Sequence, residues 1–277
     1  MKIYISVDIE GISGLRGGGE HDDARKHDEE RDTDYAKKQM TADVNAAIEG
    51  ALQAGASEIF VRDAHGSMYN LNPEELNKAA RLLSGHGRAM NMVEGIDNAF
   101  DALFLIGYHG MAGSKSGIWA HTFSSVVEKL VINDMEFGEG SLSASLAGYY
   151  KVPTVLVSGD EAAVEEVKKL IPQAEGIIVK RRNDDGLSEI IHPEVARERI
   201  REAAVRILPA FDSIKPLLLE SPIRIKLTLS KAEMAELVSF IPQVERIDAK
   251  TVSFTADDVM IAFKLFRVML GVAWSAR

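Results

Sequence analysis

The chain has 277 residues and a formal net charge of -10 at pH 7, and it contains no cysteine. A chain this acidic lacks the basic surface that binds nucleic acid or an anionic membrane, so we expect neither partner. Without cysteine there is no disulfide and no thiol nucleophile, and any metal ion must be held by carboxylate oxygens and imidazole nitrogens. The first residues lack the pattern of a signal peptide and no run of about 18 apolar residues occurs, which predicts a cytoplasmic protein without a transmembrane helix.

The first part of the chain alternates strand-like and helix-like runs. Strands are predicted at 2–8, 58–63 and 102–107, and helices at 41–54 and 73–83. This alternation is typical of parallel βαβ units with helices on both faces of a sheet. The sequence therefore predicts an α/β fold with an open, mostly parallel sheet flanked by helices.

The second part begins with a predicted hairpin and ends in a compact unit. The runs 126–132 and 135–137 flank Asn133-Asp134, which is typical of a hairpin turn. The expected elements that follow are helices from about Gly140, at 161–170 and at 194–208, strands at 154–157 and 176–179, the latter closing the sheet, and a β-α-β-α unit at 224–229, 231–240, 251–254 and 257–272. We expect two domains, a catalytic α/β domain of residues 1–192 and a smaller α+β domain of residues 193–277, with oligomerisation as a role of the smaller one.

One segment departs from the composition of the rest. Residues 20–34 contain eight acidic and three basic side chains, half of the net charge of the chain, and follow the glycines 17–19. Such a segment has almost nothing to bury and is predicted to form a surface loop. Two interpretations stay open: a solvated insertion, or a lid beside a site at the end of the first strand.

Carboxylates and imidazoles follow three of the predicted strands. Asp8 and Glu10 lie on one face of the first strand because side chains alternate, and His65 and His109, each followed by glycine, end the next strands. Ligands of open α/β sheets bind beyond the carboxyl ends of the strands. Two carboxylates and two imidazoles without a thiolate suit zinc, manganese or iron, and a shared carboxylate such as Asp8 can bridge two ions about 3.5–4 Å apart.

Glu139 is a further candidate ligand. It lies where the predicted hairpin passes into a helix. An acidic residue at a helix N-terminus is also favoured by the helix dipole alone, so both interpretations stay open at this point.

Several motifs in order resemble the D-aminopeptidases of the DppA type, a family of zinc metallopeptidases. They are SVDIEGISG from Ser6, RDAHG from Arg62, IGYHGMAG from Ile106, AHTFSS from Ala120 and FGEGSLSASLAGYY from Phe137. The resemblance implies the metal ligands Asp8, Glu10, His65, His109 and Glu139, with Asp8 between two zinc ions. For the last ligand, Glu136 is the alternative.

The sequence departs from the family at one position. A member of this family has a cysteine just before the histidine that corresponds to His121, and here Ala120 stands in that place. We therefore expect metal-activated water as the nucleophile and His121 as general acid or oxyanion stabiliser, unless His121 is only a structural loop residue. Asp63 or Asp160 is expected to accept a hydrogen bond from a metal-bound imidazole.

The resemblance implies a dizinc aminopeptidase that hydrolyses short peptides, in particular D-amino-acid dipeptides such as D-Ala-D-Ala. It implies two zinc ions, for which other divalent transition metals can substitute, and a ring-like homo-oligomer. Two alternatives stay open. A two-metal phosphoesterase would use the same ligands, although no glycine-rich phosphate loop occurs; a non-catalytic metal- or ligand-binding protein is suggested by Ala120.

Overall fold

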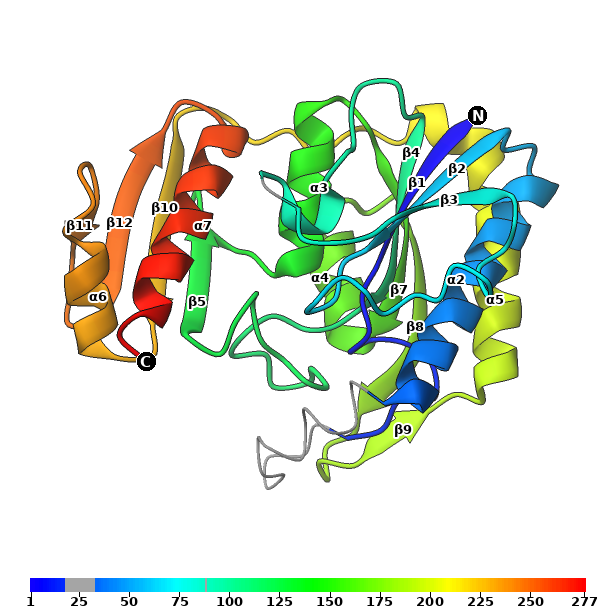
Figure 1. Ribbon diagram of the computed structural model, residues 1–277, viewed down its shortest axis with the longest axis horizontal. Helices are drawn as coiled ribbons and strands as arrows, with labels where there is room; N and C mark the ends of the chain where they lie inside the picture. The colour runs from blue at the N-terminus through cyan, green and yellow to red at the C-terminus, as the bar shows by residue number, and fades with distance from the viewer. Residues whose placement is uncertain (18–32, 88) are drawn as a thin grey trace.

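The computed structural model describes residues 1–17, 33–87 and 89–277, and its larger sheet has seven strands (Figure 1). The strand order is β3-β2-β1-β4-β7-β8-β9, and only β9 runs antiparallel to its neighbour. The strands are β1 (Lys2–Val7), β2 (Glu58–Asp63), β3 (Ala80–Leu83), β4 (Ala102–Tyr108), β7 (Thr154–Asp160), β8 (Glu175–Arg182) and β9 (Ser188–Ile190). The predicted open, mostly parallel sheet is confirmed.

The two central strands are buried on both faces. All of β4 and five of the six residues of β1 are buried. Helices cover both faces of the parallel sheet, so side chains that point to either face are shielded from water. Since β1 lies between β2 and β4, the residues that follow these three strands emerge side by side at one edge of the sheet.

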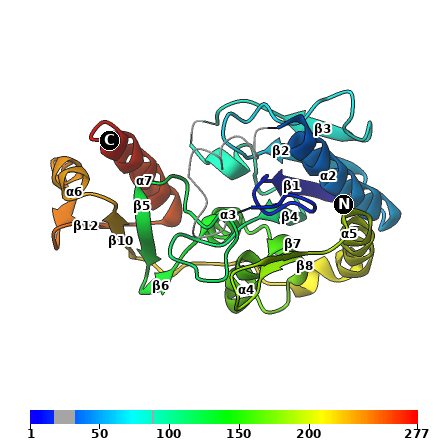
Figure 2. The same ribbon diagram turned by 90° about the horizontal axis from the view of Figure 1, so that it is seen from below.

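Four long helices cover the larger sheet, two on each face (Figures 1 and 2). One face carries α2 (Asp34–Gln53) and α5 (Pro193–Ile207), and the other carries α3 (Glu139–Tyr149) and α4 (Glu161–Leu170). Gly50 allows α2 and α5 to pack closely, since a Cβ there would lie 2.4 Å from the carbonyl oxygen of Arg201. Short 3-10 helices cover Asn91–Val93 and Leu208–Ser213.

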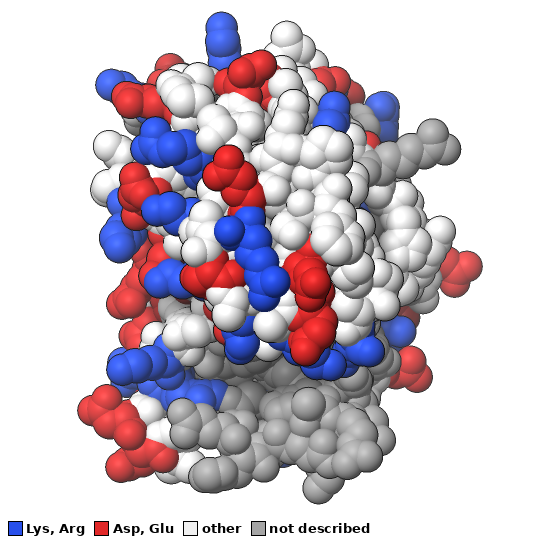
Figure 3. All heavy atoms as spheres, turned by 90° about the vertical axis from the view of Figure 1, so that its left-hand side faces the viewer, with Lys and Arg blue, Asp and Glu red and all other residues white. Residues whose placement is uncertain are grey.

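The second sheet is antiparallel, with the order β11-β12-β10-β5-β6. Its strands are β5 (Val127–Ile132), β6 (Met135–Glu136), β10 (Ile223–Leu229), β11 (Glu245–Arg246) and β12 (Thr251–Ala256), and the helices with it are α6 (Ala232–Val238) and α7 (Val259–Trp274). In β10 buried apolar residues alternate with exposed basic ones, as expected of a sheet with one wet face. On the side of the molecule seen in Figure 3, acidic and basic side chains are interspersed.

The division into domains 1–192 and 193–277 stays a prediction, but the two sheets do not separate at that point. β5 and β6 lie within the first range and join the second sheet, because β5 pairs with β10. Conversely, α5 lies in the second range and packs against α2. The predicted hairpin is present, and Asn133 and Asp134 have φ angles of 48° and 66°, as a tight hairpin turn requires.

Some predicted elements differ from the structure. The helix predicted at 73–83 is wrong: turns cover most of 73–79 and β3 follows. The side chain of Asn45, on α2, holds these turns, since it donates to the carbonyl oxygen of Glu75 and accepts from the backbone N–H of Asn77. The predicted closing strand is β8, but β9 lies beyond it, and neither β9 nor β11 was predicted, because two or three residues show no period.

The acidic segment 20–34 falls almost entirely outside the described residues. The lid interpretation concerns residues 20–32, which the structure does not describe. Thr33 caps the N-terminus of α2 by accepting from the backbone N–H of Ala36, so α2 begins at Asp34, ahead of the predicted start at 41. Among the described residues, no helix combines the length and the hydropathy needed to cross a membrane.

Candidate metal centre

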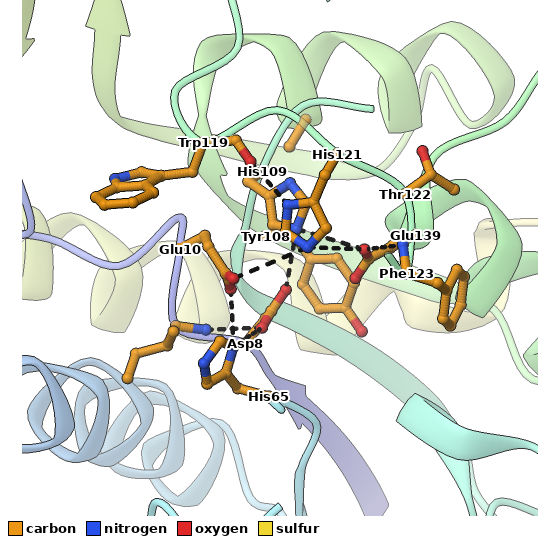
Figure 4. Close-up of polar contacts among 12 residues, drawn as sticks. Asp8, Glu10, His65, Tyr108, His109, Trp119, His121, Thr122, Phe123 and Glu139 are labelled. Atoms are coloured by element: carbon orange, nitrogen blue, oxygen red, sulfur yellow. Dashed lines mark hydrogen bonds and ion pairs between the residues drawn. The ribbon is translucent and has the colours of Figure 1, made fainter. Parts of the chain in front are cut away.

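The three neighbouring strands and one helix bring five predicted ligands together (Figure 4). Asp8 and Glu10 follow β1, His65 follows β2, and His109 follows β4. Glu139 is the first residue of α3 and points toward His109 from the other side. All five side chains are buried.

The distances divide the ligands into two groups that share Asp8. In the first, Nδ1 of His65 lies 3.3 Å from Oδ1 of Asp8 and 2.9 Å from Oε2 of Glu10. In the second, Nε2 of His109 lies 3.5 Å from Oδ2 of Asp8 and 3.6 Å from Oε1 of Glu139. Within each group, the donor atoms lie within 4.8 Å of one another. Each oxygen of Asp8 therefore faces a different imidazole.

Two glycines allow the segment after β1 to lie against the end of β4. The backbone N–H of Gly11 donates to the carbonyl oxygen of Gly107 at 2.8 Å. A Cβ on Gly11 would lie 1.8 Å from the carbonyl oxygen of Tyr108, and Gly107 has a φ of 71°, which favours glycine. Without this close approach, Asp8 and His109 would not share a site.

Backbone carbonyls orient two imidazoles of the centre. Nδ1 of His109 lies 2.9 Å from the carbonyl oxygen of Gly110, and Nδ1 of His121 lies 2.8 Å from that of Trp119. Because Nδ1 of each ring donates to a carbonyl oxygen, Nε2 is the nitrogen that faces the carboxylates. This orientation is the one that presents Nε2 to a metal ion.

The two acids expected behind the imidazoles bind backbone N–H groups. Asp63 accepts from the backbone N–H of Asn70 and of Leu71, and so fixes the turn that follows His65. Asp160 accepts from the backbone N–H of Gly110 and of Ile118, and so fixes the loop that follows His109. Both carboxylates thus hold the loops that carry the ligands.

Two buried atoms of the centre have no hydrogen-bond partner among the described residues: Oδ2 of Asp8 and Nε2 of His109. Buried polar atoms are rarely left in this state, and a cation between them would satisfy both. Three carboxylates and imidazole nitrogens with no thiolate are ligands that zinc accepts. The donor set therefore fits a metal ion on the evidence of the side chains themselves.

The electrostatics of the metal-free centre agree with a cation site. Burial, followed by the nearby charge of Glu10, raises the pKa of Asp8 to about 7. Burial opposes a charge on His109, but Glu139, Glu10 and Asp8 outweigh it and hold the pKa of His109 well above its usual value. In the metal-free centre, Asp8 and His109 thus hold protons more tightly than usual. Metal ligands release such protons when a cation binds.

His121 lies beside both groups. Its Nε2 is 3.6 Å from Oε1 of Glu139 and 3.9 Å from Oε1 of Glu10, and its ring stacks on that of His109 with centroids 4.2 Å apart. Burial and then the charge of His109 lower the pKa of His121, so its imidazole is neutral near pH 7. The donor atoms of Glu10, His109 and His121 form a third group of ligand spacing.

The loop that follows His121 also holds a candidate ligand. The backbone N–H of Phe123 donates to Oε1 of Glu139 at 2.6 Å, which keeps this carboxylate aimed at the two histidines. Glu136, the alternative ligand, is exposed on β6 and forms an ion pair with Lys129. The structure thus brings Glu139 into the centre and leaves Glu136 outside it.

The centre opens into a cleft of about 1360 Å³ between the two sheets. Its lining includes Asp8, Glu10 and Glu139, and also Arg182 at the end of β8 and Arg267 on α7. Sequence reasoning missed the last two residues. No motif surrounds them, and only the packing of α7 beside α3 brings Arg267 to this cleft.

A model of the D-aminopeptidase family matches residues 1–268. A curated D-aminopeptidase of Bacillus subtilis strain 168 is 34% identical over 274 residues, which cover 99% of this chain and 98% of the relative. The chain belongs to the D-aminopeptidase family. Its fold is similar to that of the Zn-dependent D-aminopeptidase DppA from Bacillus subtilis, described as a self-compartmentalizing protease, with a TM-score of 0.91 and 32% identity over 99% of this chain and 98% of that one.

Membership of the D-aminopeptidase family confirms the resemblance drawn from the motifs. It also confirms the prediction of a metal-dependent aminopeptidase, a hydrolase. The zinc dependence of the solved relative agrees with the donor set found here, which contains no thiolate.

Proposed function

We propose that this D-aminopeptidase family member binds two zinc ions and removes N-terminal residues from short peptides, in particular D-amino-acid dipeptides such as D-Ala-D-Ala. One observation carries the proposal: two buried groups of ligands share Asp8, and its two oxygens face different imidazoles. The zinc dependence and the D-aminopeptidase activity named for the relatives support it.

The residues divide between the two ions as the groups do. Asp8, Glu10 and His65 would hold one zinc, and Asp8, His109 and Glu139 the other. Bound zinc lowers the pKa of water toward 7 and polarises a carbonyl group, which is the chemistry that peptide hydrolysis needs. An aminopeptidase cleaves the N-terminal peptide bond, so the substrate would enter this site with its N-terminus first.

His121 is the proposed proton carrier. Its imidazole is held neutral, and its Nδ1 is fixed on the carbonyl of Trp119, so Nε2 takes a proton and later returns it to the leaving amine. Its neighbour Ala120 has no nucleophilic atom, and the chain has no cysteine, so no side-chain thiol attacks the peptide bond.

The proposal extends to assembly. A relative described as self-compartmentalizing, covered over 98% of its chain, supports a ring-like homo-oligomer for this protein as well. Enclosure of the sites would restrict substrates to short peptides, which agrees with dipeptide hydrolysis. Residues 193–277 are the proposed contributors to the contacts between copies.

The test compares zinc content and turnover in four preparations: the wild type, the wild type after chelation, His121→Asn and the matched control His192→Asn. His192 is exposed and caps α5, a role that asparagine also fills. We expect two zinc ions per chain, hydrolysis of D-Ala-D-Ala in preference to L-Ala-L-Ala, and no turnover after chelation. His121→Asn should retain both zinc ions and lose most of its turnover. His192→Asn should retain both zinc ions and its turnover.

Three results would contradict the proposal. Unchanged turnover after removal of zinc would exclude a metal mechanism. Loss of one zinc ion from His121→Asn would make His121 a ligand, through its group with Glu10 and His109. Hydrolysis of a phosphodiester without hydrolysis of any dipeptide would favour a phosphoesterase instead.

A further inference from the structure

Two arginines line the cleft of the metal centre without a carboxylate partner among the described residues. Arg182 ends β8, and its buried Nε has no hydrogen-bond partner there. Arg267, on α7, is half-buried. Burial lowers the pKa of its guanidinium group, and no neighbouring charge that the structure describes contributes to this shift. No hydrogen bond or ion pair of the Arg267 side chain occurs within the described part of the chain.

An unpaired, half-buried guanidinium group is unusual, because partial loss of water makes a cation costly unless an anion is near. Two of the other basic residues of the cleft differ from Arg267 in this respect. Lys115 and Arg277 are exposed, and the guanidinium group of Arg277 lies 4.4 Å from the ring of Trp274. Arg267 would therefore gain more from an anionic ligand than these two exposed cations.

The packing of α7 fixes Arg267 relative to the metal centre. Phe263 and Phe266, on α7, contact the ring of Phe123 with centroids 5.8 Å and 5.6 Å apart. The backbone N–H of Phe123 in turn donates to Glu139. Arg267 follows Phe266 directly, so a short series of contacts connects it to a candidate ligand of the metal.

A short peptide has a charge of opposite sign at each end. Because an aminopeptidase cleaves the N-terminal peptide bond, the α-amino group of a dipeptide lies at the metal centre and its α-carboxylate lies beyond the bond that is cleaved. A residue extends the chain by at most about 3.6 Å, so both ends of a dipeptide fit in a single cleft. A longer peptide that enters with its N-terminus first carries its carboxylate away from the centre.

We propose that Arg267 binds the C-terminal carboxylate of the substrate and so makes the enzyme selective for short peptides with a free C-terminus. The assignment rests on the proposed function, because it takes the peptide to enter with its amino group at the metal centre. Guanidinium groups bind carboxylates through two parallel hydrogen bonds, and an interaction of this kind in a partly desolvated cleft is stronger than at an exposed surface. Arg267 is thus a specificity residue that contacts the end of the substrate remote from the reacting bond.

The first experiment compares D-Ala-D-Ala with its C-terminal amide, which lacks the carboxylate. The wild type should prefer the free acid. Arg267→Gln should lower kcat/KM for the free acid about 10- to 100-fold, mainly through KM, and leave the amide within about twofold. For the free acid, kcat/KM of Arg267→Lys should lie between the values of the wild type and Arg267→Gln. Lysine keeps the positive charge but cannot form two parallel hydrogen bonds with a carboxylate.

Two further variants test the assignment to this residue. Lys264 is an exposed cation on the same helix, so Lys264→Gln also removes one positive charge from α7. This variant should change kcat/KM for neither the acid nor the amide. Arg182→Gln removes the other unpaired guanidinium group. Equal losses on acid and amide in Arg267→Gln, or loss of the preference in Arg182→Gln and not in Arg267→Gln, would overturn the proposal.

A binding measurement separates this inference from the proposed function. The probe is D-Ala-D-Ala with its amide bond reduced to a methylene-amine, as the free acid and as the C-terminal amide, titrated into zinc-loaded protein by calorimetry. Arg267→Gln should weaken binding of the acid about 10- to 100-fold and leave binding of the amide unchanged. If the wild type hydrolyses no dipeptide, the proposed function fails. Selective loss of acid binding in Arg267→Gln would still support the role of Arg267, whereas equal affinities of wild type and variant for the acid would overturn that role.

Discussion

Glu166, on α4, gives a pH-dependent test of how the loop after His109 is held. Both oxygens of its carboxylate accept from the backbone N–H of Met111, at 3.0 Å and 3.3 Å. Burial raises the pKa of Glu166 from its usual value of 4.5 to about 7, although the bond from Met111 opposes the rise. Above pH 7 the folded protein therefore carries a charge that the unfolded chain would hold at lower cost.

The substitution Glu166→Gln removes this charge and keeps an oxygen for the N–H of Met111. A tenfold change in proton affinity corresponds to about 1.4 kcal/mol, so a rise from 4.5 to about 7 corresponds to about 3 kcal/mol. Between these pH values the folded wild type keeps a proton that the unfolded chain releases, so its stability falls as the pH rises. We expect the variant to be more stable by about 3 kcal/mol at pH 8 and by less than about 1 kcal/mol at pH 5.

The assay is urea unfolding of the metal-free protein at pH 5 and pH 8, at one protein concentration because assembly affects apparent stability. Glu165→Gln is the matched control: Glu165 is its neighbour on α4 but is exposed, and its substitution should change stability by less than about 0.5 kcal/mol at either pH. The same advantage for Glu166→Gln at both pH values, or a loss of stability at pH 8, would refute the reasoning.

Two further predictions concern the metal ligands and the packing of helices. Asp8→Asn should lose both zinc ions, because Asp8 belongs to both groups, whereas Glu139→Gln should lose one. Metal analysis after dialysis checks this prediction. Equal zinc content in the two variants would contradict a shared Asp8. Gly148→Ala should destabilise the protein by about 2 kcal/mol or more, since its Cβ would lie 1.9 Å from the carbonyl oxygen of Leu217. Gly271→Ala, on α7, should stabilise it by about 0.5–1 kcal/mol, because within the described residues no atom beyond its chain neighbours and its own helix backbone lies within 4 Å of the added Cβ. Thermal unfolding compares the pair, and a loss of stability of similar size in both variants would contradict the packing argument.

The sequence was sufficient to predict that the candidate ligands that follow strands lie together. Asp8, His65 and His109 come after three strands that are neighbours in a parallel sheet, and the topology of such sheets brings their ends together. Glu139 comes from a helix on another side of the site, so strand geometry alone left it open and the family resemblance was needed. The assignment of His121 as a catalytic residue stays a prediction.

Features that depend on tertiary contacts could not be predicted. The segment 73–79 has residues that suit a helix, but the side chain of Asn45 holds it in turns. The hairpin at 127–136 was predicted correctly as local structure, yet its membership of the second sheet depends on pairing with β10, far along the chain. For the same reason no local pattern indicates that Arg267 lines the cleft.

The pairing of β5 with β10 has a consequence for truncation. β10 lies between β12 and β5, so a chain cut after residue 192 would keep β5 and lose the partner along one of its edges. An uncovered strand edge is a template for aggregation. Removal of α7 would also expose Phe123, whose backbone supports Glu139. We therefore expect the sheet that carries the candidate ligands to depend on the second sheet for its stability, and insertions or fusions to be best tolerated at surface turns away from this shared sheet.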